Sequence, residues 1–328
     1  MDMRTLGRTG RTVSVIGLGT WQLGADWGDV SEADATAVLA ASVDAGVTFF
    51  DTADVYGDGR SEQIIGAFLK QRRTGVEITV ATKMGRRVDQ IPENYVMANF
   101  RAWVDRSRGN LDTERLDLVQ LHCPPSAVID SDEVYDALDT LVEAGAIAAY
   151  GVSVETCDQA LAAIARPNLA TVQIILNAFR LKPLDAVIPA AREAGVGIIA
   201  RVPLASGLLT GKYTRDTTFA ASDHRNYNRD GSAFDVGETF SGVDFETGLA
   251  AAAEFAALVP EGLTPAQAAL AWVAQIDGVS SVIPGARSPK QAQANAAAGS
   301  VEPLSLDVNA GVQDIYDRLL REQIHPRW

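Results

Sequence analysis

Eight short apolar segments recur along this chain, and each is followed by a connection that mostly contains a helical pattern of apolar residues. They occupy residues 15–19, 47–51, 77–83, 115–122, 146–153, 171–177, 196–201 and 279–285. Strands that alternate with helices form parallel βαβ units. Eight such units predict a closed (β/α)8 TIM barrel rather than an open doubly wound sheet. We therefore expect a single α/β domain over residues 1–328.

Three segments depart from this rhythm. Residues 1–19 start with two short strands around a Gly-Arg-Thr-Gly turn, which predicts an N-terminal β-hairpin at one end of the barrel. Residues 305–328 contain an amphipathic stretch, which we expect as a helical tail packed on the barrel's outside. Residues 214–244 form a long polar loop after the seventh strand. We favour a mobile lid over the ligand for this loop, with a plain surface excursion as the alternative.

The composition is ordinary for a globular chain, with 47% apolar and 21% charged residues. The net charge is −14 and no basic stripe is visible, which argues against nucleic acid or an anionic membrane as a partner. Cys123 and Cys157 do not have a CxxC or zinc-like spacing, so we expect free thiols, a reducing compartment and no metal. A polar N-terminus and the lack of a stretch of about 18 apolar residues favour a cytoplasmic protein without a membrane span.

Polar residues close three successive apolar strands. Asp51 ends the second, Lys83 the third and His122 the fourth, and Tyr56 follows Asp51 in the stretch FFDTADVYG. In a parallel barrel these ends converge on one face, where ligands bind. A lysine at a buried strand end needs a partner, because a lone buried ammonium is costly. Each residue also has a structural alternative: Asp51 as a turn cap, Tyr56 as a loop aromatic, and His122 as an ordinary buried histidine.

These four side chains would form a coherent proton-donating group. Asp51 would pair with Lys83, and a cation near Tyr56 would lower the pKa of its phenol from about 10. Tyr56 would then donate a proton near neutral pH, while His122 would hydrogen-bond and orient a substrate carbonyl. The group has no obvious nucleophile and no electron source. A hydride would therefore have to come from a cofactor.

The stretches FFDTADVYG, VATKMG and LVQLHCPP resemble those that carry the catalytic tetrad of the aldo-keto reductase superfamily, and the resemblance covers essentially the whole chain. It implies a (β/α)8 barrel and NAD(P)H-dependent reduction of aldehydes or ketones. Tyr56 would be the general acid, Lys83 and Asp51 would set its pKa, and His122 would orient the carbonyl. Asp51 would thus end its strand to hold Lys83, and the following loop would return Tyr56 to the same point.

The resemblance also implies where the cofactor binds, without the GxGxxG fingerprint that GLGTWQLG lacks. Gly19, Thr20 and Trp21 would line the pocket floor, with Trp21 facing the substrate, although barrel-end packing is the alternative for Trp21. Residues 201–213 would hold the pyrophosphate; they mimic a P-loop, but the spacing is one residue short, so we reject a triphosphatase. The remaining implied contacts are Asp51, Ser153, Gln173, Arg201, Pro203, Leu204, Ser206, Gly207, Lys212, Gly285, Arg287, Gln291 and Asn295.

Residues 282–295 lie after the eighth strand and open a helix whose N-terminus favours anions. Ser288 and Pro289 are explained fully as an N-cap and a first helical residue. Helix capping does not explain Arg287. The resemblance implies that Arg287 clamps the adenosine 2′-phosphate, which favours NADPH over NADH. Two departures concern the nicotinamide end. Val154 stands where many members have Asn, and Arg201 stands where many have an aromatic that stacks on the ring.

Other functions remain as alternatives. A barrel isomerase or lyase would need no adenosine clamp, and a metal hydrolase would need clustered histidines. A regulatory subunit that keeps the fold and cofactor, and senses redox state with little turnover, would carry the same residues. For an enzyme, we expect a small or medium aldehyde as substrate, including sugar-derived or aromatic ones. The resemblance leaves a homo-oligomer open, because the family includes monomers and larger assemblies.

Overall fold

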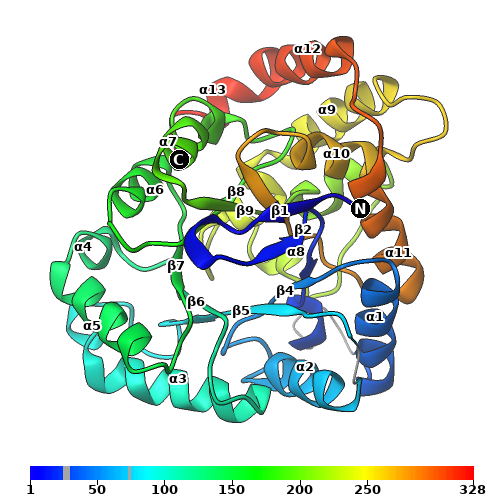
Figure 1. The fold of residues 1–328 in the computed structure, drawn as a ribbon. Helices are drawn as coiled ribbons and strands as arrows, with labels where there is room; N and C mark the ends of the chain where they lie inside the picture. The colour runs from blue at the N-terminus through cyan, green and yellow to red at the C-terminus, as the bar shows by residue number, and fades with distance from the viewer. Residues whose placement is uncertain (25–29, 73–74) are drawn as a thin grey trace.

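The computed structural model describes residues 1–24, 30–72 and 75–328. Within them, eight parallel strands pair in chain order, each with the next, from β3 to β10. The strands are β3 (Leu18–Gly19), β4 (Phe49–Asp51), β5 (Thr79–Met84), β6 (Leu118–His122), β7 (Tyr150–Ser153), β8 (Thr171–Ile175), β9 (Gly197–Arg201) and β10 (Val279–Val282). Bridges from Ile16 to Val282 and from Gly19 to Gly285 join the first strand to the last. The predicted (β/α)8 barrel is therefore confirmed (Figure 1).

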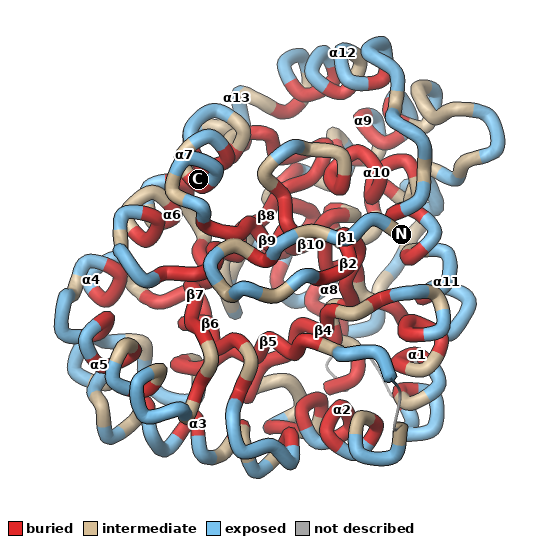
Figure 2. Tube along the Cα trace, viewed as in Figure 1, coloured by how far each residue is buried: buried red, intermediate tan, exposed pale blue. Residues whose placement is uncertain are grey.

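Ten helices of the described residues lie around these strands (Figure 1). They are α1 (Glu32–Asp44), α2 (Arg60–Gln71), α3 (Met97–Leu111), α4 (Ser126–Ile129), α5 (Asp132–Glu143), α6 (Cys157–Ile164), α7 (Val187–Ala194), α9 (Phe245–Ala257), α10 (Pro265–Ala274) and α11 (Pro289–Ala297). The short helix α8 (His224–Tyr227) belongs to the long loop and is not part of this ring. Burial is concentrated in the strands and on the helix faces that meet them (Figure 2). The helical pattern that follows the second apolar segment of the sequence, at residues 61–73, corresponds to α2, although Arg73 lies outside the described residues.

Strand residues divide between two cores because successive side chains point to opposite faces. Phe50 and Val119 belong to the large core between strands and helices, whereas their neighbours Phe49 and Leu118 belong to a smaller cluster. Leu6, in the hairpin, joins that smaller cluster and is fully buried. The hairpin therefore closes the barrel end opposite the strand C-termini.

The hairpin and the short turns match the local sequence. Strands β1 (Met3–Thr5) and β2 (Thr12–Ser14) pair antiparallel, as predicted, and Gly10 between them has a φ of 71°. The 3-10 helices are η1 (Gly7–Thr9), η2 (Trp21–Gly24), η3 (Pro92–Asn94), η4 (Lys182–Leu184), η5 (Ala205–Thr210), η6 (Val236–Glu238), η7 (Phe240–Gly242) and η8 (Ala298–Ser300).

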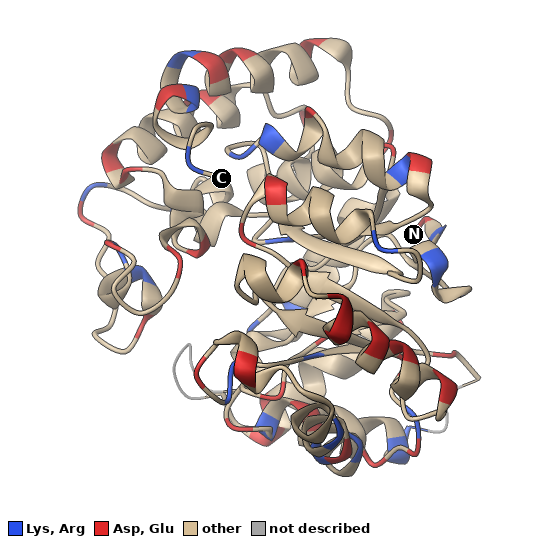
Figure 3. Cartoon of the chain, turned by 90° about the vertical axis from the view of Figure 1, so that its left-hand side faces the viewer, with Lys and Arg blue, Asp and Glu red and all other residues tan. Residues whose placement is uncertain are grey.

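The tail consists of α12 (Leu306–Ile315), a π-helical segment (Tyr316–Leu320) and α13 (Arg321–Ile324), which lie on the outside of the barrel as expected (Figure 1). Among the helices of the described residues, none combines the length and apolar character that a membrane span needs. Acidic and basic residues are interspersed over the helices and loops that face the viewer in Figure 3.

Trp328, beyond α13, packs against the long loop. Its ring is 5% exposed, its indole N–H donates to Asp235 at 3.0 Å, and the Arg180 guanidinium lies 4.1 Å from the ring centre. A Cβ at Gly242 would lie 2.2 Å from this ring, so the glycine permits the close approach. Trp328 therefore anchors the long loop of residues 214–244 through Asp235 and Gly242.

Replacing Trp328 by Ala is expected to lower the free energy of unfolding by about 3–5 kcal/mol, since it removes a buried aromatic ring and leaves a cavity. Urea denaturation followed by far-UV circular dichroism measures this change. Leu306→Ala is the matched control, because Leu306 belongs to the same tail but is 85% exposed. That control should change stability by less than about 0.5 kcal/mol. Equal effects of the two variants would contradict the anchoring role of Trp328.

Candidate active site

Three of the predicted catalytic side chains lie on neighbouring barrel strands. Asp51 is the last residue of β4, Lys83 precedes the end of β5, and His122 is the last residue of β6. The register pairs Asp51 with Ala81 and Lys83 with Gln120. All three predicted side chains are buried. Because parallel strands share one carboxyl-terminal edge, the barrel brings these residues together at its mouth.

Lys83 and Asp51 form a buried ion pair. The Lys83 ammonium lies 2.5 Å from Asp51 Oδ1 and also donates to the carbonyl of Thr52 at 2.9 Å. The other carboxylate oxygen of Asp51 accepts hydrogen bonds from Gln120 at 3.1 Å and Gln173 at 2.7 Å. Burial lowers the pKa of Lys83, but Asp51 and Tyr56 raise it to a net value above the ordinary one. Lys83 is therefore a charged donor held in one position.

Tyr56 lies in the turn after β4, beside this pair. Its hydroxyl is 3.4 Å from the Lys83 ammonium, which is 5.1 Å from the centre of the phenol ring. The sequence predicts a lowered pKa for Tyr56, and this is wrong for the structure described here. Burial raises the pKa of Tyr56, and the attraction of Lys83 offsets only part of that rise. Tyr56 is consequently a neutral phenol at pH 7, which is the form that a proton donor requires.

His122 is a neutral imidazole beside the phenol. Burial lowers its pKa well below the usual value, and the cations Arg86, Lys83 and Arg201 lower it further. Its ring centre lies 6.0 Å from that of Tyr56, in an edge-on arrangement. Within the described part of the chain, the buried Nδ1 of His122 has no hydrogen-bond partner. Such a group is uncommon in a folded protein. His122 is not among the residues that line the cavity beside Tyr56.

A cavity of about 330 Å³ opens beside Tyr56. The predicted contacts that line it are Gly19, Thr20, Trp21, Asp51, Gln173, Arg201, Pro203, Leu204, Ser206, Gly207, Gly285, Arg287 and Gln291. Three predicted contacts do not line it. Ser153 is buried against Cys123, with 3.4 Å between Oγ and Sγ, Lys212 is exposed, and Asn295 donates to the carbonyl of Gly285 at 3.1 Å.

The long loop supplies a cavity wall that the sequence did not identify by residue. His224 and Phe234 lie against Trp21, with ring centres 5.2 and 6.0 Å from its own. Trp21 in turn stacks near Tyr56, at 6.1 Å and an interplanar angle of 20°. Burial lowers the pKa of His224 to about 4, so this ring is neutral. The aromatic residues in the loop were a signal, but nothing in the sequence showed which of them face the cavity.

Two arginines line the cavity. Arg287 is exposed, whereas Arg225 forms an ion pair with Asp223 at 2.5 Å. The backbone N–H of Arg287 donates to Gln291 Oε1 at 2.7 Å, while Ser288 caps α11 by accepting from the backbone of Gln291. Ser206, which also lines the cavity, has a φ of 53°, a sparsely populated value for a residue other than glycine.

A closed cycle of four charges, which we call the arginine–glutamate cycle, lies beside the cavity. It comprises Arg86, Glu155, Arg201 and Glu238. Arg201 lies 2.8 Å from Glu155 and 3.5 Å from Glu238, and Arg86 lies 3.3 Å from each of the two glutamates. Only Arg201 was anticipated from the sequence. The others come from separate loops, and nothing in their local sequence indicates that they meet.

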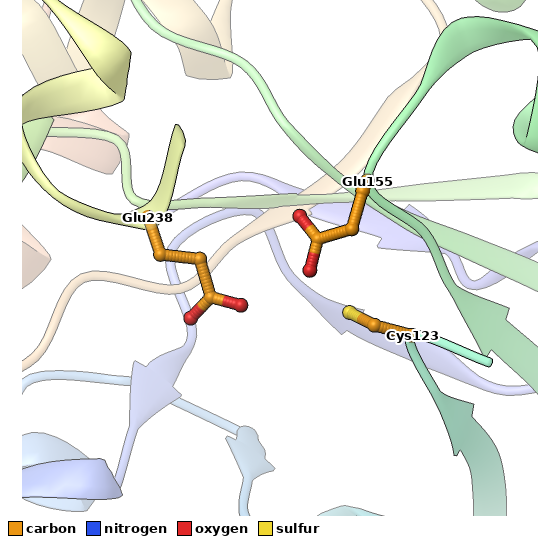
Figure 4. A group of neighbouring side chains, drawn as sticks. All are labelled: Cys123, Glu155 and Glu238. Atoms are coloured by element: carbon orange, nitrogen blue, oxygen red, sulfur yellow. The ribbon is translucent and has the colours of Figure 1, made fainter. Parts of the chain in front are cut away.

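Three side chains in and beside the cycle are spaced like metal ligands, but the arginines of the cycle already contact them. Cys123, Glu155 and Glu238 point toward one another (Figure 4), and their ligand atoms lie within 4.8 Å. However, Arg201 already donates to Glu155 and contacts the Cys123 sulfur at 3.7 Å. Burial raises the pKa of the Cys123 thiol to about 12, so it is not a thiolate. Two guanidinium groups therefore occupy the place that a cation would take.

Comparisons with known proteins agree with this geometry. A model of the aldo/keto reductase family matches residues 15–317. The chain is 30% identical over 292 residues to the NADP(+) aldo-keto reductase yakc of Schizosaccharomyces pombe, across 87% of this chain and 83% of the relative. It is 31% identical over 325 residues to a probable voltage-gated potassium channel subunit beta of Arabidopsis thaliana, across 93% of both. The structure of the glycerol dehydrogenase AKR11B4 from Gluconobacter oxydans is similar with a TM-score of 0.80 and 30% identity, covering 100% of this chain and 98% of that one.

Proposed function

The chain belongs to the aldo/keto reductase family, and from this premise we propose that it reduces aldehyde or ketone carbonyls to alcohols with NADPH. The observation that carries the proposal is the neutral phenol of Tyr56, 3.4 Å from a charged Lys83, at the edge of a ligand-sized cavity. A carbonyl oxygen that gains negative charge during reduction needs a proton from such a group.

The described residues fit a nicotinamide cofactor. Gln22 lines the cavity, and its Oε1 is buried without a hydrogen-bond partner among the described residues. Arg287 also lines the cavity and is exposed, which gives a phosphate group a positive partner in a chain of net charge −14. When bound, NADPH supplies the hydride that none of these side chains can provide.

The chain's own residues would manage the proton. Tyr56 donates its hydroxyl proton to the substrate oxygen, and the Lys83 ammonium stabilises the phenolate that remains. Asp51 holds Lys83 charged and in place through the 2.5 Å contact. His122, as a neutral imidazole, donates a hydrogen bond to the same substrate oxygen and orients it. Each role follows from the protonation state that the surroundings impose.

The aromatic wall indicates the kind of substrate. Trp21 and His224 line the same cavity as Tyr56 with flat, uncharged rings, and Phe234 packs against both of them. Such surfaces suit planar or apolar groups. We propose small or medium aldehydes, with aromatic ones reduced most efficiently, and a single catalytic domain formed by residues 1–328.

The first test measures NADPH oxidation by loss of absorbance with a panel of aldehydes and ketones, beside NADPH binding by fluorescence. Binding together with turnover is the expected result and ranks the substrates. Binding without turnover on any carbonyl would instead support a second candidate function, a cofactor-binding regulatory subunit. The observation that favours this candidate is the 31% identity to a probable potassium channel subunit beta. Absence of NADPH binding would contradict both functions.

Replacing Arg287 by Ala is expected to raise the KM for NADPH by about 10- to 100-fold and leave the KM for NADH nearly unchanged. A charge-assisted hydrogen bond to the 2′-phosphate, worth about 1.5–3 kcal/mol, would be lost, and NADH lacks this phosphate. Steady-state kinetics with both cofactors measures the change. Lys290→Ala is the matched control, because it removes an exposed positive charge from the first turn of α11, three residues after Arg287. Equal changes for NADPH and NADH would contradict the clamp.

A further inference from the structure

The arginine–glutamate cycle gathers residues from four separate segments. Arg86 follows β5, Glu155 follows β7, Arg201 ends β9, and Glu238 belongs to η6 in the long loop. Although burial opposes its charge, the pKa of Glu238 is lowered to about 2 by Arg201 and Arg86. Burial likewise opposes the charge of Arg201, but Glu155 and Glu238 raise its pKa above the ordinary value. Two positive and two negative groups leave the cycle neutral when both glutamates are ionised.

A second set of charges lies behind the cycle. Arg180 donates to the backbone carbonyl of Glu155 at 2.9 Å and lies over Trp328. Its charge faces Asp235, which accepts the indole N–H of Trp328. Burial and Arg201 lower the pKa of Arg180 to about 10, and Asp235 offsets only part of this effect. Arg180 and Arg201 therefore act on each other, and the cycle is the group of these charges that lines the cavity.

The cycle acts on the reacting groups. Arg201 and Glu238 line the same cavity as Tyr56. Glu238 raises the pKa of Tyr56, while Arg86 and Arg201 lower that of His122, so the charges are felt at both side chains. A hydride and a proton must reach the same carbonyl group, and the proton comes from Tyr56. The reactive ring of the cofactor must therefore lie beside Tyr56, within the field of the cycle.

We propose that Glu238 is a specificity-determining residue that sets the relative affinity of the site for oxidised and reduced cofactor. This inference rests on the proposed function. The nicotinamide ring is positively charged in NADP+ and neutral in NADPH. Arg201 alone would repel the oxidised ring, and Glu238 neutralises that repulsion. Because Glu238 belongs to the long loop, the position of this loop and the oxidation state of the bound cofactor are coupled.

The test measures the dissociation constants of NADP+ and NADPH by isothermal titration calorimetry. Burial raises the pKa of Glu155 above its ordinary value, so the titrations start at neutral pH and extend upward, and the comparison uses the pH range in which the ratio of the two constants no longer changes. Glu238→Gln leaves one uncompensated positive charge. It is expected to raise the ratio of the NADP+ to the NADPH dissociation constant by about tenfold, from Coulomb's law at an effective dielectric constant of about 20. A tenfold change in this ratio raises the midpoint potential of the bound couple by about 30 mV.

A second variant distinguishes an effect of charge on cofactor affinity from an effect of detaching the long loop. Arg86→Gln also breaks the contact between Arg86 and Glu238, but it leaves one uncompensated negative charge, so the ratio should fall by about tenfold. The double variant Arg86→Gln/Glu238→Gln restores neutrality and should return the ratio to near the wild-type value. Asp216→Asn is the charge control, because it removes an exposed carboxylate from the same loop. It should leave the ratio unchanged.

Opposite shifts in the two single variants support the proposal. Shifts in the same direction, or an unchanged ratio in both, would overturn it and leave the cycle as a structural anchor of the loop. If Glu238→Gln does not fold, the fall expected for Arg86→Gln still decides the question. A wild-type protein that binds neither form would refute the proposed function itself, whereas binding with an unaltered ratio in the variants would refute only this inference.

Discussion

Replacing Tyr56 by Phe is expected to lower kcat by about 10²- to 10⁴-fold and to leave the dissociation constant of NADPH nearly unchanged. The variant keeps the ring that lies 6.1 Å from Trp21 and loses only the hydroxyl that faces Lys83. Since the phenol is neutral in the structure, the proton is present before reduction begins, and Phe cannot supply it. Single-turnover kinetics with an aldehyde, beside cofactor titration, measures both quantities.

Tyr150→Phe is the matched control for this substitution. Its hydroxyl donates to Asp139 at 2.7 Å, on a different face of the barrel wall from the cavity, so kcat should change by less than about twofold. A Tyr56→Phe enzyme that keeps the wild-type rate would show that another group donates the proton. A large rise in the NADPH dissociation constant would instead show that the phenol serves mainly to bind cofactor.

Strand periodicity and the residues at strand ends predicted the barrel and the neighbourhood of Asp51, Lys83 and His122. Each strand carries its own apolar signal, and parallel pairing then fixes where its end must lie. The loop return that brings Tyr56 to Lys83 was also readable, because only a few residues separate Asp51 from Tyr56. Local order along the chain was enough for these features.

Features that depend on contacts between distant segments could not be predicted from the sequence. Glu238 meets Arg86 across 152 positions, and Trp328 meets Asp235 across 93. No periodic signal marks either pair. Side-chain direction was equally hidden: Lys212 stands in the expected phosphate loop, yet the structure leaves it exposed. A sequence places a residue on an element but does not show which way a flexible side chain points.

The prediction that the pKa of Tyr56 is lowered was wrong because two opposing effects had to be weighed by size. Charge proximity is visible in a sequence once the fold is assumed, and it correctly indicated that Lys83 lowers this pKa. The opposing effect is desolvation, which depends on how completely the surrounding residues exclude water. Burial proved to be the larger effect. Residues of the long loop line the same cavity as Tyr56, and their sequence did not predict how closely they approach it.

Replacing Asp51 by Asn is expected to lower the free energy of unfolding by about 3–5 kcal/mol, because it leaves the buried Lys83 ammonium without its counter-ion. A group whose pKa is raised in the folded state contributes stability that is complete below its unfolded pKa and is lost as pH rises through the folded value. Lys83 has such a raised pKa. The difference between wild type and variant should therefore be full at neutral pH and shrink above about pH 10.4, as urea denaturation at several pH values would measure.

Replacing the other member of the ion pair shows which of the two buried charges needs its partner more for stability. Lys83→Met leaves Asp51 with hydrogen bonds from Gln120 and Gln173 at 3.1 and 2.7 Å, so it should cost less stability than Asp51→Asn. The double variant should recover part of the loss, since it leaves no unpaired charge. All three variants should lose turnover, because Lys83 then no longer stabilises the Tyr56 phenolate from a fixed position. A larger stability loss for Lys83→Met would contradict this account and make the carboxylate the group that needs its partner.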